Sequence, residues 1–564
     1  MLPTLFRVFG EKYLVLTKRR IIPLLILTVL AVATRLIFDR VPLKPLRAAL
    51  GPVRFVDIAA QAGINYRWLP DGPRPLNILG TIGNGCAFLD YNNSGCLSVL
   101  LVGTDHLALF QGDGHGHFRD VSHAMGLDKL RGHFLGCAVG DYDNDGYEDV
   151  YISGYRTGLL LHNDGGKHFT DVTQAAGLKP QPWGTACAWA DVDGDGRLDL
   201  FVGNYVRFGP KTLPRMCPWN GTQVACGPEL YQPERGVLYR NLGKGKFRDV
   251  TKAWKADKTS GKVLGAAFAD FDGSGRQSLY LANDMVPGNL LCKEDSRMTD
   301  VGPASGTALG GDGNPHGSMG VDWGDYDNDG RLDLVIGTFQ NQAKSVFHNS
   351  GNGLFDERSA ALSLIRPIPY VTFGVKWLDC DNDGWLDLLL TSGHIIDNVN
   401  QANNKLSYRQ PILCFYNEQG RRFADVSDEA GLALAAPIVG RGLAVGDFDN
   451  DGRVDALVVD SEGAPLLLRN QSQPVGHWLS FKLVGTKSNR DGIGALVTVT
   501  AGGLTQTRLC HTDGSYLSAS DVRVHVGLGN AAVAERVRVH WPSGQVDVLH
   551  HVKADRFLTI REGG

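Results

Sequence analysis

Short apolar segments alternate with polar, glycine-containing segments along most of the chain, and they do so in groups of four. The first segment of each group begins with a small residue, at Gly85, Gly136, Ala186, Gly265, Gly320, Gly374 and Gly442. An acidic turn follows, and then a second segment such as LSVLLVG, a third such as VLYRN and a fourth such as KFRDVT. Four short strands separated by turn residues predict one four-stranded antiparallel sheet per group.

The groups recur often enough to predict a closed ring. Their acidic turns begin at Asp90, Asp141, Asp191, Asp270, Asp325, Asp379 and Asp447, so successive groups lie 50 to 79 residues apart. A period of this size with four strands per repeat predicts a β-propeller. We therefore expect an all-β fold with a seven-bladed propeller over residues 54–472. The segment RFVDIAAQAGI at 54–64 is predicted to supply the fourth strand of the last blade.

Five of the acidic turns carry the complete pattern Asp-x-Asp-x-Asp-Gly-x-x-Asp, and those at Asp90 and Asp270 are degraded copies. Hard cations such as Ca²⁺ take about six to eight oxygens from a short, sharply turning loop. The closing carboxylate stands at position 9 and no helical pattern flanks the turns, so an EF-hand is not predicted. We expect about five Ca²⁺ ions, with the degraded turns weak or empty. The predicted ligands are Asp141, Asp143, Asp145, Asp149, Asp191, Asp193, Asp195, Asp199, Asp325, Asp327, Asp329, Asp333, Asp379, Asp381, Asp383, Asp387, Asp447, Asp449, Asp451 and Asp455.

These repeats resemble FG-GAP/VCBS repeats of the integrin α-propeller type. The tail from about His477 resembles the ASPIC/UnbV domain in the phrases HWLSFKLVGTKSNRDGIGALVTVTAGG, GSYLSASD, VHVGLG and VHWPSGQVDVL. Together they are similar to the bacterial relatives of cartilage acidic protein. The resemblance implies that a small C-terminal β-sandwich-like domain at 476–562 follows the propeller.

The N-terminal residues 1–40 predict a hydrophobic helix that directs export. Lys18, Arg19 and Arg20 directly precede the apolar run IIPLLILTVLAVA. This segment is either a cleaved signal peptide or an uncleaved membrane anchor with its basic end inside. In both cases the rest of the chain is expected to be periplasmic, extracellular or membrane-anchored, after a linker at 41–53.

Charge and cysteine content add two expectations. The net charge is −4, but the complete turns hold a third of the acidic residues, so bound Ca²⁺ would reverse its sign. No basic run or DNA-binding motif is present, so no nucleic-acid partner is predicted. Cys217 and Cys226 lie in an insertion of the third repeat and are predicted to form a disulfide in an exported protein. Cys86, Cys137 and Cys187 occupy one core position of the first strands.

Candidate ligand-binding residues follow from their place in each blade. The metal turns join first to second strands, so residues before first strands or after second strands lie on the opposite face, around the channel mouth. The residues predicted there are His133, Trp183, Asn283, Asp284, His316, His394 and Arg441. Such groups suit a polar or sugar-like ligand, although polar loop tips are equally expected in a solvated turn. In the C-terminal domain, Arg490 and Asp491 either bind a ligand or stabilise a turn. Asp322 and Lys376 are predicted to form a buried ion pair.

We therefore predict a calcium-stabilised binding or interaction module at the cell envelope, monomeric, with a protein or glycan ligand. The alternative is an enzyme acting at the channel mouth on a carbohydrate or, as the resemblance to relatives encoded beside enediyne-type genes implies, on a natural product. No nucleophile elbow, HExxH or P-loop is present. A deep funnel containing a His or Asp of shifted pKa would favour the enzyme, and a flat rim would favour the binder.

Overall fold

The structure is a computed structural model that describes residues 53–564 apart from 71, 213–214, 296 and 474. Strands predominate in these residues and helices are short, so the all-β prediction is confirmed. No helix in this part of the chain is long and apolar enough to cross a membrane. The predicted segment at 1–40, and all of the predicted linker except Val53, lie outside the described residues.

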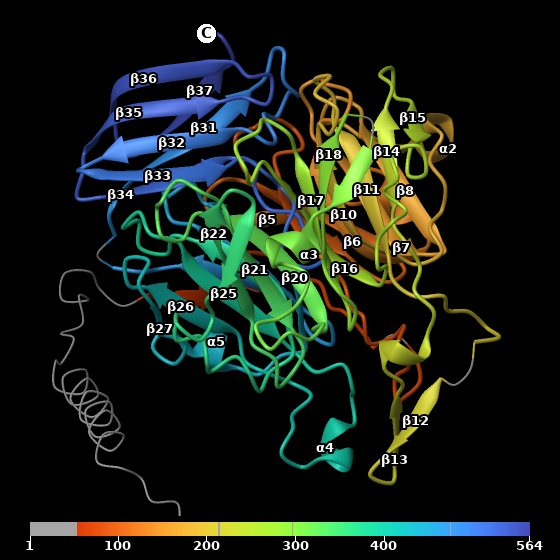
Figure 1. The fold of residues 1–564 in the computed structure, drawn as a ribbon. Coiled ribbons are helices and arrows are strands. Elements are labelled where there is room, and N and C mark those ends of the chain that lie inside the picture. Colours follow the sequence, from red (N-terminus) through yellow and green to blue (C-terminus); the bar gives the residue numbers. More distant parts are fainter. Residues whose placement is uncertain (1–52, 71, 213–214, 296, 474) are drawn as a thin grey trace, which may run out of the picture. The chain divides into compact units, whose positions relative to one another are not determined.

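Seven four-stranded antiparallel sheets, here called ring sheets 1 to 7, occupy the described residues from Phe55 to Asn470 (Figure 1). Ring sheet 1 contains β2 (Cys86–Leu89), β3 (Ser98–Val102), β4 (Leu107–Gly112) and β5 (Phe118–Asp120). Ring sheet 2 contains β6 (His133–Gly140), β7 (Asp149–Tyr155), β8 (Thr157–Asn163) and β9 (Phe169–Asp171). Ring sheet 3 contains β10 (Gly184–Ala190), β11 (Asp199–Asn204), β14 (Val237–Asn241) and β15 (Phe247–Asp249).

The next three sheets repeat this order. Ring sheet 4 contains β16 (Val263–Ala269), β17 (Ser278–Asn283), β18 (Asn289–Glu294) and β19 (Arg297–Asp300). Ring sheet 5 contains β20 (Ser318–Gly324), β21 (Asp333–Thr338), β22 (Ser345–Gly351) and β23 (Leu354–Glu357). Ring sheet 6 contains β24 (Thr372–Leu378), β25 (Asp387–Ser392), β26 (Leu413–Asn417) and β27 (Phe423–Asp425).

Ring sheet 7 is completed by the start of the described chain. It contains β28 (Gly440–Gly446), β29 (Asp455–Asp460), β30 (Leu466–Asn470) and β1 (Phe55–Asp57). β1 pairs antiparallel with β30, placing Phe55 opposite Asn470. The first strand of each ring sheet contacts that of the next, and β28 contacts β2, so the sheets close into a ring.

Neighbouring ring sheets share hydrophobic cores. For example, Ala138 and Tyr151 of ring sheet 2 pack with Trp189 and Leu200 of ring sheet 3. Because neighbours cover both faces of a sheet, its first strand is buried throughout, as in β10, β16, β20 and β24. This burial explains why these strands are continuous apolar segments instead of alternating ones.

Short elements lie between the strands. The connection between β11 and β14 carries a hairpin of β12 (Met216–Trp219) and β13 (Thr222–Ala225). Single helical turns are η2 (Leu127–Lys129), α2 (Thr173–Ala176), η3 (Pro228–Leu230), α3 (Gly302–Ser305), α4 (Val399–Ala402) and α5 (Leu432–Ala435).

The C-terminal strands form two sheets around one core. One sheet contains β31 (His477–Val484), β34 (Val524–Gly529) and β37 (Arg556–Arg561). The other contains β32 (Leu496–Ala501), β33 (Leu504–Leu509), β35 (Val533–His540) and β36 (Val546–Lys553). Phe481, Val497, Val526 and Val537 from both sheets pack together, which gives a β-sandwich.

The loop between β33 and β34, residues 510–523 and here called the plug loop, occupies the centre of the ring. Ala519 N donates to Cys86 O at 3.0 Å, and Phe88 N donates to Ala519 O at 3.1 Å. Val321 and Ser515 bond each other through their backbones at 3.1 and 2.6 Å. Further bonds join the plug loop to β6, β16, β24 and β28. Six of the seven first strands therefore bond to one loop.

The plug loop explains the small residues at the start of first strands. A Cβ atom on Gly85 would lie 1.7 Å from Leu517 O, and one on Gly442 would lie 2.6 Å from Ser518 Oγ. Side chains at these positions would displace the loop. The crowding expected at the centre thus comes from the C-terminal domain as well as from neighbouring first strands.

Candidate functional site

Each complete acidic turn is held by the carboxylates at its two ends. In the turn at Asp379, the first carboxylate accepts bonds from Asp383 N at 3.1 Å and Gly384 N at 2.8 Å. The last carboxylate, Asp387, accepts from Cys380 N at 3.0 Å and from Asn417 N on the third strand at 2.7 Å. The turns at Asp141, Asp191, Asp325 and Asp447 repeat these bonds, so positions 1 and 9 shape the loop.

The carboxylate at position 3 is left with oxygens that no protein donor satisfies. Asp193 Oδ1, Asp327 Oδ1 and Asp381 Oδ2 are buried and lack a hydrogen-bond partner. In the turns at Asp141 and Asp191, oxygens from positions 1, 3 and 9 lie within 4.8 Å of one another, and in the turn at Asp325 those from positions 1, 3 and 5 do so. Buried unpaired carboxylates are costly, and converging oxygens are the ligands that hard cations need. These clusters therefore fit a metal ion.

Burial and mutual repulsion change the acidity of these clusters. Desolvation, together with the charge of Asp383, raises the pKa of Asp381 to about 8. Desolvation and the charge of Asp383 also raise the pKa of Asp379 to about 7, although Arg508 opposes the shift. The anionic form of the cluster therefore needs a compensating cation.

In each ring sheet with a complete turn, one side chain of the third strand lies against the turn. The type of this residue differs among the five complete turns. His162 Nδ1 lies 3.2 Å from Asp149, and His348 Nδ1 lies 3.3 Å from Asp327. Tyr416 donates to Asp383 at 3.0 Å. Arginines stand at this place in the other two turns: Arg240 pairs with Asp193, and Arg469 lies 2.6 Å from Asp449. The clusters at Asp191 and Asp447 therefore already contain a third-strand guanidinium, and in the turn at Asp325 the guanidinium of Arg331 pairs with Asp329.

Position 4 of the turns forms links that the sequence pattern did not reveal. Asn144 Nδ2 donates to Gly196 O of the next turn at 3.0 Å, and Asn328 Nδ2 donates to Gly384 O at 3.0 Å. Asn450 Nδ2 donates to Gly95 O at 3.1 Å, joining the last turn to the first. These asparagines have positive φ, a conformation that favours Asn or Gly. Gly194 and Gly273 stand at this position in ring sheets 3 and 4, which lack the link.

The C-terminal domain covers the face of the ring that carries the acidic turns, here called the loop face. Asp491 accepts a bond from Asp141 N at 2.7 Å, and Arg490 N donates to Asn144 Oδ1 at 2.8 Å. Arg523 bonds Asp447 O at 2.8 Å. The backbone of Arg490 and the carboxylate of Asp491 thus join the domain to the ring.

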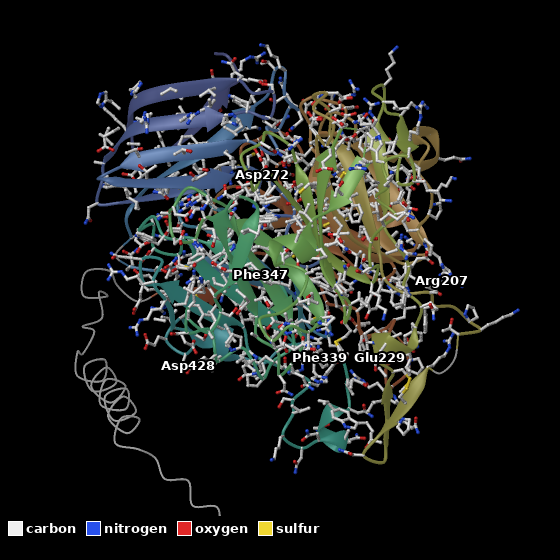
Figure 2. The ribbon with its side chains drawn as sticks, in the orientation of Figure 1. Arg207, Glu229, Asp272, Phe339, Phe347 and Asp428 are labelled. Carbon is white, nitrogen blue, oxygen red and sulfur yellow. A yellow bond between two sulfur atoms is a disulfide. The ribbon has the colours of Figure 1, made fainter. Side chains whose placement is uncertain are left out.

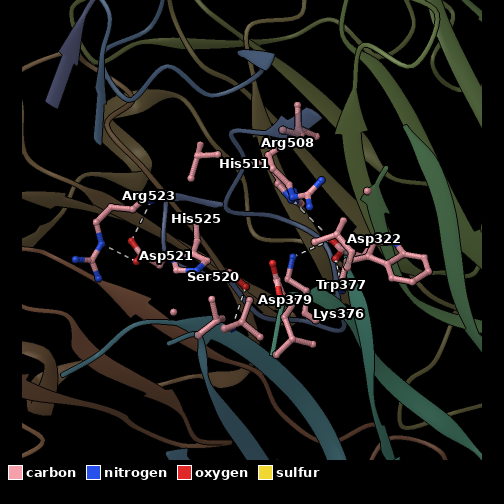
Figure 3. Close-up of a pocket in the computed structure, with 18 of the residues that line it drawn as sticks. Asp322, Lys376, Trp377, Asp379, Arg508, His511, Ser520, Asp521, Arg523 and His525 are labelled. Carbon is pink, nitrogen blue, oxygen red and sulfur yellow. Dashed lines mark hydrogen bonds and ion pairs between the residues drawn. The ribbon is translucent and has the colours of Figure 1, made fainter. Parts of the chain in front are cut away.

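A cavity of about 110 Å³ lies between this domain and the ring (Figure 3). Its lining includes Lys376, whose ammonium lies 2.8 Å from Asp322, as the sequence predicts for a buried pair. His511 faces Asp513 at 2.9 Å on the plug loop. Acidic and basic groups alternate around the cavity, so it presents no single charge to a ligand.

The opposite face carries the predicted ligand-binding residues, and most of them are buried. Trp183 is fully buried and contacts the rings of Tyr155 and Tyr205, and Asn283 Nδ2 donates to Pro287 O at 2.8 Å. Arg441 donates to carbonyls including Thr81 O at 2.7 Å, and burial lowers the pKa of His394 to about 4. His133 packs against Tyr155, and His316 bonds Asp312 at 3.1 Å. The structure thus ties these six side chains into packing or hydrogen bonds, and their binding role stays a prediction.

Asp284 differs because it lines a cavity of about 400 Å³ on the same face. Tyr205 Oη donates to Asp284 Oδ2 at 2.5 Å. Desolvation raises the pKa of Asp284 to about 6, against the bond from Tyr205 and the charge of Lys262. The walls are mostly apolar and include Ile82, Leu264, Met319, Phe339 and Phe373.

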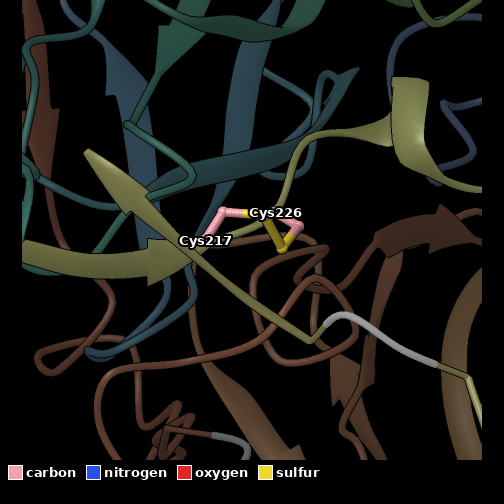
Figure 4. The surroundings of a disulfide bond; sticks show 2 residues. All are labelled: Cys217 and Cys226. Carbon is pink, nitrogen blue, oxygen red and sulfur yellow. A yellow bond between two sulfur atoms is a disulfide. The ribbon is translucent and has the colours of Figure 1, made fainter.

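Two insertions meet beside this cavity. Cys217 and Cys226 form a disulfide at the base of the β12–β13 hairpin, and Cys217 and Trp219 line the cavity (Figure 4). The hairpin contacts the α4 segment, since Asn398 Nδ2 donates to Gln223 O at 2.9 Å. Figure 1 shows both projecting on the side away from the C-terminal sandwich. Sequence spacing gave no signal for this contact, because the two insertions lie in different repeats.

Comparison with known proteins agrees with this architecture. Residues 90–152, 141–202 and 325–390 match the FG-GAP-like repeat, and residues 485–564 match the ASPIC and UnbV domain. The chain contains FG-GAP-like repeats and a C-terminal ASPIC/UnbV domain. This assignment places the plug loop, with its GSYLSASD segment, within the ASPIC/UnbV domain.

The chain, with its FG-GAP-like repeats and ASPIC/UnbV domain, is homologous to cartilage acidic protein 1. The Xenopus tropicalis protein is 26% identical over 501 residues, covering 82% of this chain and 70% of that protein. The mouse protein is 26% identical over 457 residues, and the match spans only 65% of its length. An Agrocybe aegerita lectin, described as recognising non-reducing terminal N-acetylglucosamine, aligns with 16% identity and a TM-score of 0.40 over 68% of this chain and 86% of the lectin. A likeness of that degree carries no argument about function.

Proposed function

We propose that this chain is an exported, calcium-stabilised interaction module of the cell envelope that binds a protein or glycan ligand through the face opposite the acidic turns. One observation carries the proposal: the C-terminal domain bonds to the turns of the loop face, whereas insertions surround an open cavity on the opposite face. Binding sites commonly lie on loops that a rigid scaffold positions.

Calcium is the metal we propose for the complete turns. Carboxylate oxygens predominate in these clusters, although His162 and His348 lie against two of them, and oxygen ligands suit a hard cation better than zinc, which prefers nitrogen and sulfur. When bound, the ion would neutralise each cluster, and position 3 would supply the oxygens that lack protein donors. Export is supported by the basic and apolar N-terminal pattern and by the disulfide.

The cavity gives some support to the alternative of an enzyme. Asp284 has a raised pKa of about 6 and lies beside Tyr205, which meets part of the condition set for a catalytic funnel. Its described lining contains a second carboxylate, Glu229, but no His, Lys, Ser or free Cys. The arrangement therefore favours binding over turnover.

The proposal is tested by mapping ligand binding to one face. Wild-type protein and two variants are applied to a glycan array and to fractionated envelope proteins. We expect Trp219→Ala, in the hairpin on the opposite face, to lose at least tenfold in apparent affinity for whatever binds. Arg490→Ala, on the loop-face side, serves as the matched control and should bind like wild type. Loss in Arg490→Ala with normal binding by Trp219→Ala would place the binding surface on the C-terminal domain instead.

A further inference from the structure

The cavity beside Asp284 has apolar walls and one acidic end. Ile78, Ile82, Leu264, Met319 and Ile396 supply aliphatic surface. Aromatic rings come from Trp219, Phe339 and Phe373. Figure 2 shows Phe339 and Glu229 on the side of the ring that carries the hairpin. At about 400 Å³ the cavity is large enough for a molecule of two fused rings, since about 150 Å³ accommodates benzene.

The acidic end of the cavity carries more negative than positive charge. Asp284 and Glu229 both line the cavity, whereas its described lining contains no Lys, Arg or His. Lys262 lies close enough to lower the pKa of Asp284, and Glu229 lies close enough to raise it. Glu229 is exposed and has no hydrogen bond or ion pair among the described residues. Two carboxylates against one ammonium leave one negative charge at this end.

The hydrogen bonds of Asp284 leave room for a donor from a ligand. Tyr205 satisfies Oδ2 at 2.5 Å, and Tyr205 is itself held in place because only 3% of it is exposed. Tyr205 is the one donor to the Asp284 carboxylate among the described residues, and it bonds Oδ2, so Oδ1 has no protein donor there. A carboxylate that is held by one hydrogen bond and has its second oxygen unpaired can accept a hydrogen bond from an N–H group of a ligand. Aromatic rings nearby add a favourable surface for a cation.

We propose that this cavity binds a small organic cation, with an apolar body against the aliphatic and aromatic walls and an ammonium group at Asp284 and Glu229. A neutral ligand would leave the net negative charge uncompensated, and an anionic one would be repelled by it. Burial of the apolar body would supply most of the affinity, and the ammonium group would supply the selectivity. The inference rests on the proposed binding role of this face and names the chemistry of its ligand.

The walls of the cavity come from separate parts of the chain that have to assemble first. Ile78 and Ile82 belong to the segment before β2, Trp219 to the hairpin, and Ile396 to the segment before α4. Phe373 is also in contact with Tyr516 of the plug loop, at 4.7 Å between ring centroids. The test therefore uses the complete chain with both domains present.

The test compares three molecules of the same shape that differ in charge. Calorimetric titrations would be done in buffer containing about 2 mM Ca²⁺. The three probes are 2-naphthylmethylamine, 2-naphthylmethanol and 2-naphthoate, each at a concentration on the order of 1 mM. We expect the amine to bind at least about tenfold more tightly than the alcohol, and the carboxylate to bind most weakly. Asp284→Asn should reduce the affinity for the amine to that for the alcohol and leave the alcohol unchanged. Glu229→Gln should give a smaller loss, and as an exposed site it carries the test if Asp284→Asn does not fold.

Asp312→Asn is the matched control, because Asp312 is an exposed carboxylate on the same face that does not line the cavity. It should bind all three probes like wild type. Equal affinities for the three probes, no binding at all, or equal effects of Asp284→Asn and Asp312→Asn would overturn the proposal. Such a failure would leave the proposed function standing if Trp219→Ala still abolished protein or glycan binding, so the two outcomes are distinguishable.

Discussion

The loop face and the opposite face of the ring are built on different principles. The loop face repeats an acidic turn in every ring sheet, complete in five and degraded in ring sheets 1 and 4, and in each complete turn the carboxylate at position 1 accepts the same backbone bond. The opposite face is formed by segments that occur once, among them the β12–β13 hairpin and the α4 segment. Repetition thus serves stability on one side, and single insertions create a cavity on the other.

This contrast predicts that stability and binding separate between the faces. Changes on the loop face should lower the free energy of unfolding first and binding only as a consequence. Changes at the cavity should alter binding with little loss of stability, because partly exposed loop residues rarely carry much of it. The predictions below test this separation, beginning with the largest expected effect.

Removing calcium should produce the largest change in stability. A ligand present at 100 times its Kd stabilises the native state by about 2.7 kcal/mol per site, and up to five complete turns contribute. We expect a chelator to lower the melting temperature strongly and re-added Ca²⁺ to restore it, measured by differential scanning calorimetry. Added Mg²⁺ is the control and should restore little, since Mg²⁺ dehydrates reluctantly and prefers octahedral sites. An unchanged melting curve after exhaustive chelation would refute the calcium assignment.

Truncating Tyr516 at the tip of the plug loop should have the next largest effect. Its side chain is fully buried against Phe373, and its hydroxyl donates to Ile82 O at 2.9 Å. Large-to-small changes of buried aromatics cost about 3–5 kcal/mol, so Tyr516→Ala should lose an amount of that order in urea unfolding. Tyr516→Phe is the control and should lose only about 0.5–1.5 kcal/mol with the hydrogen bond. Equal losses in the two variants would mean that packing of the Tyr516 aromatic side chain contributes little to stability.

The arginines on the third strands should make the acidic turns unequal. Asp381→Asn alters a turn faced by Tyr416, whereas Asp193→Asn alters one that Arg240 already neutralises in part. We expect Asp381→Asn to remove more of the calcium-dependent stability, by about 1.4 kcal/mol for each tenfold difference in Kd. The measurement is the difference in unfolding free energy with and without Ca²⁺ for each variant. An equal or greater loss in Asp193→Asn would show that Arg240 does not compete with the ion.

Removing the disulfide should have the smallest global effect. Cys217 and Cys226 close a short hairpin outside the ring sheets, so the loss of a constraint acts mainly on the hairpin. The double variant Cys217→Ser, Cys226→Ser should lose up to about 2–3 kcal/mol, the chain-entropy value for a closed loop of this size, as local opening of the hairpin, with little change in the unfolding of the ring sheets. It should nevertheless speed proteolytic cleavage in the hairpin, read out by mass spectrometry of the fragments. A large drop in global stability would show that folding of the hairpin is coupled to folding of the ring sheets more strongly than its contacts indicate.

The sequence predicted the repeated features well and the single features poorly. Local sequence patterns that recur in the repeats predicted the four strands per repeat and the acidic turns. Comparison of the same position in adjacent repeats predicted the Asp322–Lys376 pair. The cavity could not be predicted, because Tyr205, Asp284 and Phe339 come together only through the closure of the ring. Position within the blade predicted residues such as Trp183 and Arg441 on the face opposite the acidic turns, but it could not show that their side chains are buried. Burial there depends on the plug loop and the segment before β2, which are distant in sequence.

The pairing of β1 with β30 also sets an order of events during synthesis. Residues 55–57 are synthesised before the rest of the ring, but their partners at 468–470 come only at its end. At about 5–20 residues per second, more than 400 residues of elongation separate the two strands by roughly 20–80 s. The plug loop at 510–523 is made later still, yet it bonds six first strands at the centre. The first strands therefore cannot make all their native contacts at the centre of the ring until the C-terminal domain has been synthesised.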